Sequence, residues 1–381
     1  MKKKIAILGS TGSIGKTLLD IISKDIKNFE ISLLTTNTNY IQLINQAKLF
    51  KVKNLIVINK KSFDKINKLN KKNKFNIYNN FNSYNKIFKK KIDYTMSSII
   101  GLDGLKPTID IIRYTKKIVI ANKESIVCGW NLIKKELEKH KTEFIPVDSE
   151  HFSIWYALKN NNKKNVDKIY LTASGGPFLK KSTKKINLTD ALNHPNWKMG
   201  KKISIDSATM MNKVFEIIEA KNIFNITYSK LDILTHPSSY VHAILKFQDG
   251  LTNIILHDTT MKIPIHNTLY SKETKILNLK KIDLNLLNNL DLKKIDLKKF
   301  PLVKIINTLP NKVSLFETVI VSANDKLVNN YLNGKIKFHQ IQKKLLKFIN
   351  NKEFRKFKRI EPKKIENIID LNKYVRLKIK P

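Results

Sequence analysis

The chain has 381 residues, 42% of them hydrophobic, which is long for one hydrophobic core, so we expect two or three domains. No apolar run approaches the length of a bilayer span, which argues against a membrane protein. The single cysteine, Cys128, excludes an intrachain disulfide. Together with an N-terminus that shows no signal or transit peptide, it favours a reducing, cytoplasmic compartment.

The formal net charge of +41 is the strongest signal in the composition. A charge of this size is typical of nucleic-acid-binding proteins. Only four of the 72 basic residues are Arg, however, and nucleic-acid-binding sites favour Arg for its bidentate hydrogen bonds. Lys, Asn and Ile share A/T-rich codons, so genome base composition explains the excess better. We therefore interpret the charge as a lysine-rich surface and expect no nucleic-acid partner.

Residues 1–150 alternate short apolar strands with helical stretches. Buried strands are expected at residues 5–8, 31–34, 55–58 and 118–121, and residues 16–23 have helical spacing. This alternation predicts an α/β fold with a doubly wound parallel, Rossmann-like sheet covered by helices on both faces. Within the Lys/Asn-rich tract 59–91, Phe81, Tyr84 and Phe88 recur at helical spacing, which predicts an amphipathic surface helix.

The rest of the chain divides by composition. Residues 151–270 hold most of the histidines and strand-like runs at 168–172, 244–247 and 253–256, which predicts a central α/β catalytic domain. Residues 271–300 are rich in Lys, Asn, Asp and Leu, carry no catalytic constellation and are interpreted as a linker. Residues 301–381 have helical spacing and predict a C-terminal helical domain. Its expected core includes Leu315, Val319, Leu327 and Leu332.

A glycine-rich loop, Gly-Ser-Thr-Gly-Ser-Ile-Gly at residues 9–15, follows the first strand and opens a helix. Glycines there let the backbone approach a phosphate, and the helix N-terminus supplies N–H donors. The spacing differs from the usual dinucleotide fingerprint, and a tight strand-to-helix turn is the alternative. The second strand ends at residues 35–39 without the acid that binds an NAD ribose, which favours NADPH. Residues 1–150 are therefore the expected NADPH-binding domain.

Two short polar motifs follow apolar stretches. Residues 122–125, Asn-Lys-Glu-Ser, stand where doubly wound sheets place ligands, although an exposed turn with a helix cap is the alternative. Within residues 146–151, Asp148 and Glu150 are two positions apart and would point the same way from an extended segment. Two such carboxylates suit Mg²⁺ or Mn²⁺, and an acidic helix N-terminus is the alternative.

A longer motif begins with His-Pro-Asn-Trp-Lys-Met-Gly at residues 194–200 and continues through residues 204–213, with Glu216 and Glu219 beyond. A helix here places Asn212 and Glu216 on one face, at i and i+4. Its hydroxyl, amide and ammonium groups suit a phosphate monoester, and Glu216 is a candidate ligand to complete a metal site.

Two further expectations come from the aromatic and histidine content of this region. Trp197, between Asn and Lys and close to Gly200, is typical of a mobile lid. The remaining histidines match no zinc spacing, so ordinary buried or surface roles are expected for His236, His242, His257 and His266.

Taken in order, these motifs resemble those of the 1-deoxy-D-xylulose 5-phosphate reductoisomerase family. The resemblance lies in residues 9–15, 121–125, 146–151, 171–178 and 194–213. It continues more weakly through Met261, residues 264–265 and residues 322–325, and so covers essentially the whole chain. The block that ends in Met-Met-Asn-Lys at residue 213 is highly specific, whereas the glycine loop is not.

The resemblance implies a set of site residues. For NADPH these are Thr11, Gly12, Ser13 and Ile14 at the pyrophosphate, with Asn37, Thr38, Asn39, Asn122, Glu124 and Gly200. For a divalent ion, Mn²⁺, Mg²⁺ or Co²⁺, they are Asp148, Glu150 and Glu216, which with Lys123 form the implied catalytic set. For the substrate they are Lys123 and Ser149 at its oxygenated carbons, Ser174, His194, Ser207, Asn212 and Lys213 at its phosphate, and Trp197 with Met199 in a flap; the metal carboxylates Glu150 and Glu216 are also implied to bind the substrate.

The resemblance also implies the chemistry. A metal ion polarises oxygens of 1-deoxy-D-xylulose 5-phosphate, a carbon–carbon bond breaks and reforms, and NADPH reduces the resulting branched aldehyde to 2-C-methyl-D-erythritol 4-phosphate. This reaction belongs to non-mevalonate isoprenoid biosynthesis, and enzymes of the family are homodimers.

Some positions depart from the family pattern. Residues 37–39, Asn-Thr-Asn, stand where Gly-Lys/Arg-Asn is frequent, residues 259–262 read Thr-Thr-Met-Lys where Pro-Asp-Met-Arg is usual, and Ser238 replaces a Gln. None of these changes removes an implied metal ligand, so an active enzyme is expected. Two rival interpretations remain: another NAD(P)-dependent oxidoreductase acting on a phosphorylated metabolite, and a basic nucleic-acid-binding protein.

Overall fold

The computed structural model describes residues 2–71, 73–179, 186–197, 199–271, 275–279 and 281–380. These residues form two compact units. The first contains Met1–Ser125, Leu132–Asp148 and Met261–Leu277, and the second contains Ile126–Asn131, Ser149–Thr260 and Asn278–Pro381. No helix within the described ranges has the length and apolarity needed to cross a bilayer. Lys198, in the lid motif, lies outside the described residues.

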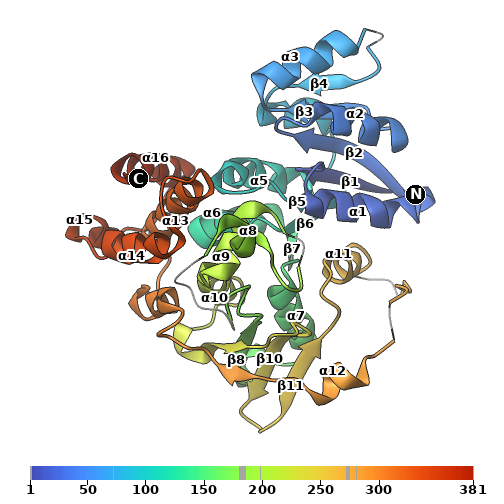
Figure 1. Cartoon of the computed structure of the whole chain (residues 1–381). Helices are drawn as coiled ribbons and strands as arrows, with labels where there is room; N and C mark the ends of the chain where they lie inside the picture. Colours follow the sequence, from blue (N-terminus) through green and yellow to red (C-terminus); the bar gives the residue numbers. More distant parts are fainter. Residues whose placement is uncertain are drawn as a thin grey trace. The chain divides into compact units, whose positions relative to one another are not determined.

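The first unit is built on a seven-stranded sheet in the order β4-β3-β2-β1-β5-β6-β7, in which every pair of neighbours is parallel. The strands are β1 (Lys3–Leu8), β2 (Phe29–Thr36), β3 (Asn54–Val57), β4 (Asn76–Tyr78), β5 (Tyr94–Ser97), β6 (Lys117–Ile120) and β7 (Glu143–Pro146). Figure 1 shows β1 to β4 in succession, in shades of blue. The strand order reverses between β1 and β5, where such sheets bind ligands at the carboxyl edge. The predicted doubly wound parallel sheet is confirmed.

The helices of this unit are α1 (Ser13–Ser23), α2 (Tyr40–Leu49), α3 (Lys60–Leu69), α4 (Tyr84–Ile87), α5 (Leu105–Ile111), α11 (Lys262–Leu269) and much of α6 (Lys123–His140). Because helices cover both faces, β1 is buried at four consecutive positions, from Ile5 to Leu8. All four predicted strands are present. The sequence analysis did not predict β4, β5 or β7.

The surface helix predicted from Phe81, Tyr84 and Phe88 is wrong. Only Tyr84–Ile87 is α-helical, after a 3-10 turn at Phe81–Ser83. Tyr84 and Phe88 are buried, and their ring centroids lie 6.1 and 5.7 Å from that of Tyr114. Tyr84 and Phe88 therefore belong to an aromatic core cluster and not to an exposed amphipathic face.

The segment Met261–Leu277 returns to the first unit. Its helix α11 packs against α1, the Tyr270 hydroxyl donates to a carboxylate oxygen of Asp25 at 2.8 Å, and the Tyr270 ring meets Phe29 edge-on. This grouping differs from the predicted boundaries at residues 150, 270 and 300. The difference arises because a segment far along the chain packs on the first sheet, which local periodicity cannot show.

The second unit contains a mixed five-stranded sheet in the order β11-β10-β8-β9-β12. Its strands are β8 (Val166–Ala173), β9 (Leu231–Thr235), β10 (Val241–Phe247), β11 (Thr252–Leu256) and β12 (Lys293–Lys294). Two helices, α7 (Ser149–Leu158) and α10 (Met211–Phe224), share the core of this sheet: Ile154 and Ile217 pack in one buried cluster with Ile169 and Ala243. This packing holds α7 and α10 together, and both helices carry predicted site residues.

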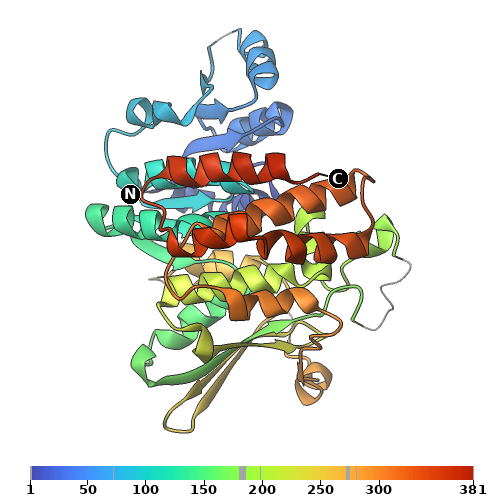
Figure 2. The ribbon, with the colours of Figure 1, turned by 90° about the vertical axis from the view of Figure 1, so that its left-hand side faces the viewer.

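The other helices of the second unit are α8 (Leu188–Leu192), α9 (Lys201–Ala208), α12 (Leu284–Asn288), α13 (Phe316–Leu332), α14 (Phe338–Ile349), α15 (Lys352–Arg355) and α16 (Ile365–Lys378). Helices α14, α15 and α16 pack against α13, and Figure 2 shows this C-terminal group in orange and red. The predicted helical character is confirmed, with Leu315, Val319 and Leu327 buried and Leu332 partly buried. Part of the predicted linker is ordered as α12 and as β12, which pairs with β9.

Candidate active site

The glycine loop lies at the carboxyl end of β1, as predicted. Gly9 has φ +82°, and a Cβ atom there would lie 2.9 Å from the carbonyl oxygen of Ser98, which follows β5. Gly12 caps the N-terminus of α1. A turn with glycines at residues 9 and 12, at the switch point and just before a helix N-terminus, fits a pyrophosphate. The hydroxyls of Thr11 and Thr36 lie 2.7 Å apart, so the loop is joined to the end of β2.

Residues 37–39 follow β2 and are exposed. Asn39 caps α2, its side chain accepting the backbone N–H of Gln42 at 3.2 Å. Thr38 offers a hydroxyl at the position where the family resemblance implies a cation. Neither Asp nor Glu occurs between Glu30 and Asp64 in the sequence, so no carboxylate of this stretch would repel a 2′-phosphate.

The motif at residues 122–125 begins α6. Asn122 is its N-cap, accepting the Ser125 N–H at 2.7 Å, so the helix-cap alternative describes its local role. Its amide also donates to the carbonyl of Gly101 at 2.7 Å, which ties α6 to the loop after β5. Glu124 is buried in the first turn. Lys123, also buried, forms an ion pair with Asp148.

Three carboxylates gather at the start of α7. Asp148 ends the first unit and is joined directly to Ser149, the first residue of α7. One oxygen from each of Asp148, Glu150 and Glu216 lies within 4.8 Å of the other two, as the metal prediction requires. The predicted extended geometry is wrong, because Glu150 occupies the first helical turn. Three acidic oxygens at this spacing fit a hard divalent cation such as Mg²⁺.

A buried lysine sits among these carboxylates. Lys213 Nζ lies 2.7 Å from Glu150 Oε1 and also pairs with Glu216. Burial alone would raise the pKa of Glu150, but Lys213 holds it well below its usual range. Burial would lower the pKa of Lys213, and the two glutamates raise it above its usual value instead. As predicted, Asn212 and Glu216 share a face, and the Asn212 amide donates to Glu216.

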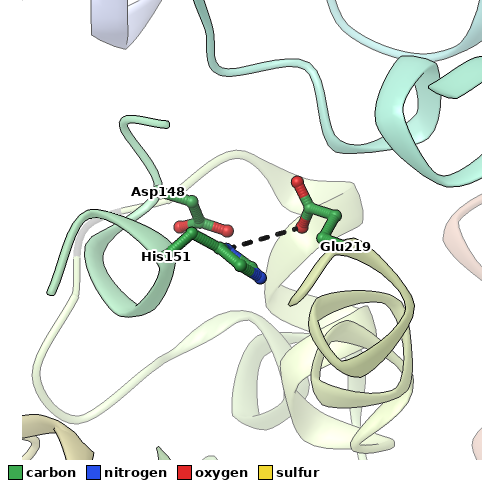
Figure 3. A group of neighbouring side chains, drawn as sticks. All are labelled: Asp148, His151 and Glu219. Carbon is green, nitrogen blue, oxygen red and sulfur yellow. Dashed lines mark ion pairs between the residues drawn. The ribbon is translucent and has the colours of Figure 1, made fainter. Parts of the chain in front are cut away.

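A second acidic group contains a histidine that the sequence analysis gave no role. Asp148, His151 and Glu219 each place one ligand atom within 4.8 Å of the others. Figure 3 shows these three side chains. His151 Nδ1 lies 3.9 Å from Glu219, and Nε2 donates to the main-chain carbonyl of Glu216 at 2.9 Å. His151 therefore holds α10 in place at Glu216, which is a predicted metal ligand. The available signal was positional: Glu219 lies three residues after Glu216 and His151 one after Glu150.

The predicted phosphate residue Ser174 is held by a neutral histidine. His194 Nδ1 accepts the backbone N–H groups of Asn196 and Trp197, at 3.2 and 3.0 Å, so the ring hydrogen is on Nε2. Nε2 lies 2.9 Å from Ser174 Oγ, to which it donates. Burial lowers the pKa of His194 to about 4, which keeps the ring neutral near pH 7. Ser174 Oγ also accepts the Gly176 N–H at 3.1 Å, and its own hydrogen remains a donor for a ligand.

Two backbone features bring the remaining phosphate residues to the same part of the second unit. Gly176 has φ +64°, and a Cβ there would lie 3.1 Å from Ala208 Cα and from the Ser207 carbonyl oxygen. The loop that carries Ser174 therefore closes on the end of α9. Met210, with φ +63°, then turns the chain from α9 into α10, whose first turn carries the predicted amide and ammonium.

The predicted flap residues lie on an irregular segment before α9. Trp197 and Met199 are partly buried, and Gly200 caps α9. The Trp197 ring meets His242 nearly edge-on, with centroids 6.3 Å apart, and His242 stacks on His257 at 3.7 Å. Burial, followed by the charge of His257, lowers the pKa of His242 to about 3. The sequence analysis expected ordinary histidines here, but His242 lies against the predicted flap.

Buried charges tie α9 to the C-terminal helices. Asn324 Nδ2, from α13, donates to Asp206 at 2.7 Å. Lys202 Nζ lies 3.1 Å from Asp206 and 3.0 Å from Asp325, and Arg376 of α16 reaches Asp325 at 3.2 Å. Asp206 immediately precedes Ser207, so this network fixes the helix that presents a predicted phosphate ligand.

The comparisons with known proteins agree along the whole chain. Three family models match: 1-deoxy-D-xylulose 5-phosphate reductoisomerase over residues 5–129, its C-terminal domain over 144–224, and the DXP reductoisomerase C-terminal domain over 256–378. The reductoisomerase of Pelagibacter ubique is 62% identical over 99% of this chain and 98% of its own length. That of Thermoanaerobacter is 38% identical, with the same shares covered.

Solved structures extend this agreement to the fold. The Zymomonas mobilis reductoisomerase in complex with NADPH has a TM-score of 0.87 at 29% identity, covering 99% of this chain and 98% of that one. A reductoisomerase bound to NADPH, fosmidomycin and magnesium has a TM-score of 0.91 at 30% identity, covering 98% and 97%. With the glycine loop, the acidic group and the residue 194–213 motif all in place, the chain belongs to the 1-deoxy-D-xylulose 5-phosphate reductoisomerase family.

Proposed function

We propose that this protein converts 1-deoxy-D-xylulose 5-phosphate to 2-C-methyl-D-erythritol 4-phosphate, using NADPH and a divalent metal ion, in non-mevalonate isoprenoid biosynthesis. The observation that carries the proposal is the three-carboxylate group at the start of α7, with Lys213 inside it. Relatives and structural neighbours of this family include enzymes bound to NADPH, fosmidomycin and magnesium.

Asp148, Glu150 and Glu216 would hold the metal ion, which when bound acts as a Lewis acid toward the substrate's carbonyl and hydroxyl oxygens. Lys123 and Ser149 would contact those oxygens. Lys123 is buried and paired with Asp148, and Ser149 donates to Glu150 at 2.5 Å, so both are already oriented by metal-binding carboxylates. Mg²⁺, Mn²⁺ and Co²⁺ all suit this donor set.

The substrate phosphate would be bound in the second unit. Ser174 and Ser207 offer hydroxyl donors, and Asn212 and Lys213 offer an amide and an ammonium group from the first turn of α10. A charge-assisted bond from a buried lysine is the strongest single contact of this set. His194 supports Ser174 through its Nε2 hydrogen. Trp197 and Met199 would cover the substrate, as expected of a flap.

NADPH, when bound, supplies the hydride for the reduction step. Thr11, Gly12, Ser13 and Ile14 would bind its pyrophosphate at the N-terminus of α1, as the exposed N–H groups there allow. The other proposed cofactor residues are Asn37, Thr38, Asn39, Asn122, Glu124 and Gly200. We further propose that the protein is a cytoplasmic homodimer.

A metal-dependence assay tests this function. Purified protein should oxidise NADPH when given 1-deoxy-D-xylulose 5-phosphate and Mg²⁺ or Mn²⁺. Excess chelator should stop the reaction, and added Mg²⁺ should restore it. Full turnover in excess chelator would refute the proposed role of the acidic group.

A further inference from the structure

The carboxyl end of β2 carries no cation. A 2′-phosphate has nearly two negative charges near neutral pH and binds best to charged donors. Residues 37–39 are exposed and offer one hydroxyl, from Thr38, and two side-chain amides. The Asn39 side chain already caps α2. A cation would have to come from a neighbouring element. The inference that follows rests on the proposed use of NADPH.

The neighbouring element is the loop after β3. The Ile58 N–H donates to the Thr36 carbonyl, and the Asn59 N–H donates to the Asn37 carbonyl, each at 3.1 Å. The two loops are therefore hydrogen-bonded beyond the ends of their strands. Lys60 and Lys61 follow at once, as the first two residues of α3, and both are exposed.

The topology leaves few other sources of charge in this stretch. Of the described residues 31–63, the only other lysines are Lys48, Lys51 and Lys53. These lysines lie at the end of α2 or just before β3, and so at the amino end of β3, away from the carboxyl end of β2. The Lys60 ammonium pairs with Asp64 at 3.0 Å, but both side chains are at least half exposed, so this pair is weak and exchangeable.

We propose that Lys60 and Lys61 supply the positive charge for the 2′-phosphate of NADPH that Thr38 does not supply. The two lysines stand beside residues 37–39 through the Asn59–Asn37 hydrogen bond. The N-terminus of α3 adds its dipole in the same place. In this chain the residues that determine the preference for NADPH over NADH therefore follow β3 instead of β2.

Equilibrium binding of two cofactor fragments tests the proposal. Adenosine 2′,5′-bisphosphate and adenosine 5′-monophosphate should be titrated against the full chain by calorimetry. The double variant Lys60→Ala/Lys61→Ala should bind the bisphosphate about tenfold or more weakly, with the monophosphate nearly unchanged. The matched control is Lys65→Ala/Lys68→Ala, which removes the same charge from exposed positions further along α3 and should change neither affinity.

Rescue and kinetics sharpen the result. Adding Thr38→Lys to the double variant should restore most of the lost bisphosphate affinity, and the ratio of kcat/KM for NADPH to that for NADH should follow the same pattern. Unchanged bisphosphate binding in the double variant would overturn this inference while leaving the use of NADPH intact. If the unaltered protein bound both fragments equally and oxidised both cofactors equally, the NADPH preference and this inference would fall together.

Discussion

Lys213 Nζ lies 2.7 Å from Glu150 Oε1, which places an ammonium group proposed to bind phosphate directly against a carboxylate proposed to bind metal. Both side chains are largely buried, and Lys213 also pairs with Glu216. A metal ion competing for the two glutamates would release Lys213 toward the substrate phosphate. The two binding events are therefore expected to be coupled.

Lys213→Ala should raise the KM for 1-deoxy-D-xylulose 5-phosphate by tenfold or more, because a buried charge-assisted hydrogen bond is lost. Inhibition by fosmidomycin should weaken in parallel. Lys246→Ala, on an exposed ion pair of β10, serves as the control and should change neither value. Equal KM values for Lys213→Ala and the unaltered protein would place the phosphate elsewhere.

The two acidic groups can be separated by a pair of isosteric changes. Glu216→Gln should lower kcat by about two orders of magnitude or more and remove the response to Mg²⁺, because a proposed ligand is lost. Glu219→Gln, one turn further along α10, should retain saturable Mg²⁺ dependence. Thermal unfolding of both variants checks the fold. The reverse pattern would assign the metal to Asp148, His151 and Glu219 instead.

The bond from Asn324 to Asp206 should matter for substrate more than for cofactor. Asn324→Ala removes the 2.7 Å donor from a buried carboxylate, which costs about 1–3 kcal/mol of stability and loosens α9 next to Ser207. The KM for the sugar phosphate should rise while the KM for NADPH stays close to its original value. Asn329→Ala, exposed on the same helix, is the control. A stability loss with no change in substrate KM would limit the bond to a structural role.

Glu317 predicts a pH dependence of stability. Burial raises its pKa to about 7, although the Ser314 hydroxyl donates to it and Lys221 lies nearby. Below the ordinary value of 4.5 the group is protonated in both the folded and unfolded states. As the pH rises from 4.5 to about 7, the unfolded state loses this proton while the folded state keeps it, so stability falls by on the order of 3 kcal/mol. Denaturant titrations at pH 5 and pH 8 should show this loss, and Glu317→Gln should reduce it. An equal loss in that variant would assign the pH dependence to other groups.

Local pattern predicted the elements with a clear hydrophobic or glycine signature. The four apolar strands follow from short runs of hydrophobic residues, and the glycine loop follows from its glycines after a strand. The shared face of Asn212 and Glu216 follows from the 3.6-residue period. The surface helix predicted around Tyr84 was wrong, because three aromatic residues at helical spacing can also form a core cluster on a chain of short turns.

Contacts between distant segments were beyond the reach of the sequence pattern. Nothing local shows that Tyr270 packs on Phe29, or that Asn59 bonds to Asn37. The role of His151 was missed for the same reason, since its partners lie on α10, more than 60 residues away. The implied ligands were found from family resemblance, and the structure then supplied the lysine and histidine groups that hold them.

Analysis of the product by ¹³C NMR tests the central claim most directly. Purified protein should be incubated with 1-deoxy-D-xylulose 5-phosphate, NADPH and Mg²⁺, and the carbon skeleton of the product determined. We predict the branched 2-C-methyl-D-erythritol 4-phosphate, formed in equal amount to the NADPH consumed and only when a divalent ion is present. An unbranched reduced sugar phosphate, or no consumption of NADPH, would contradict the account.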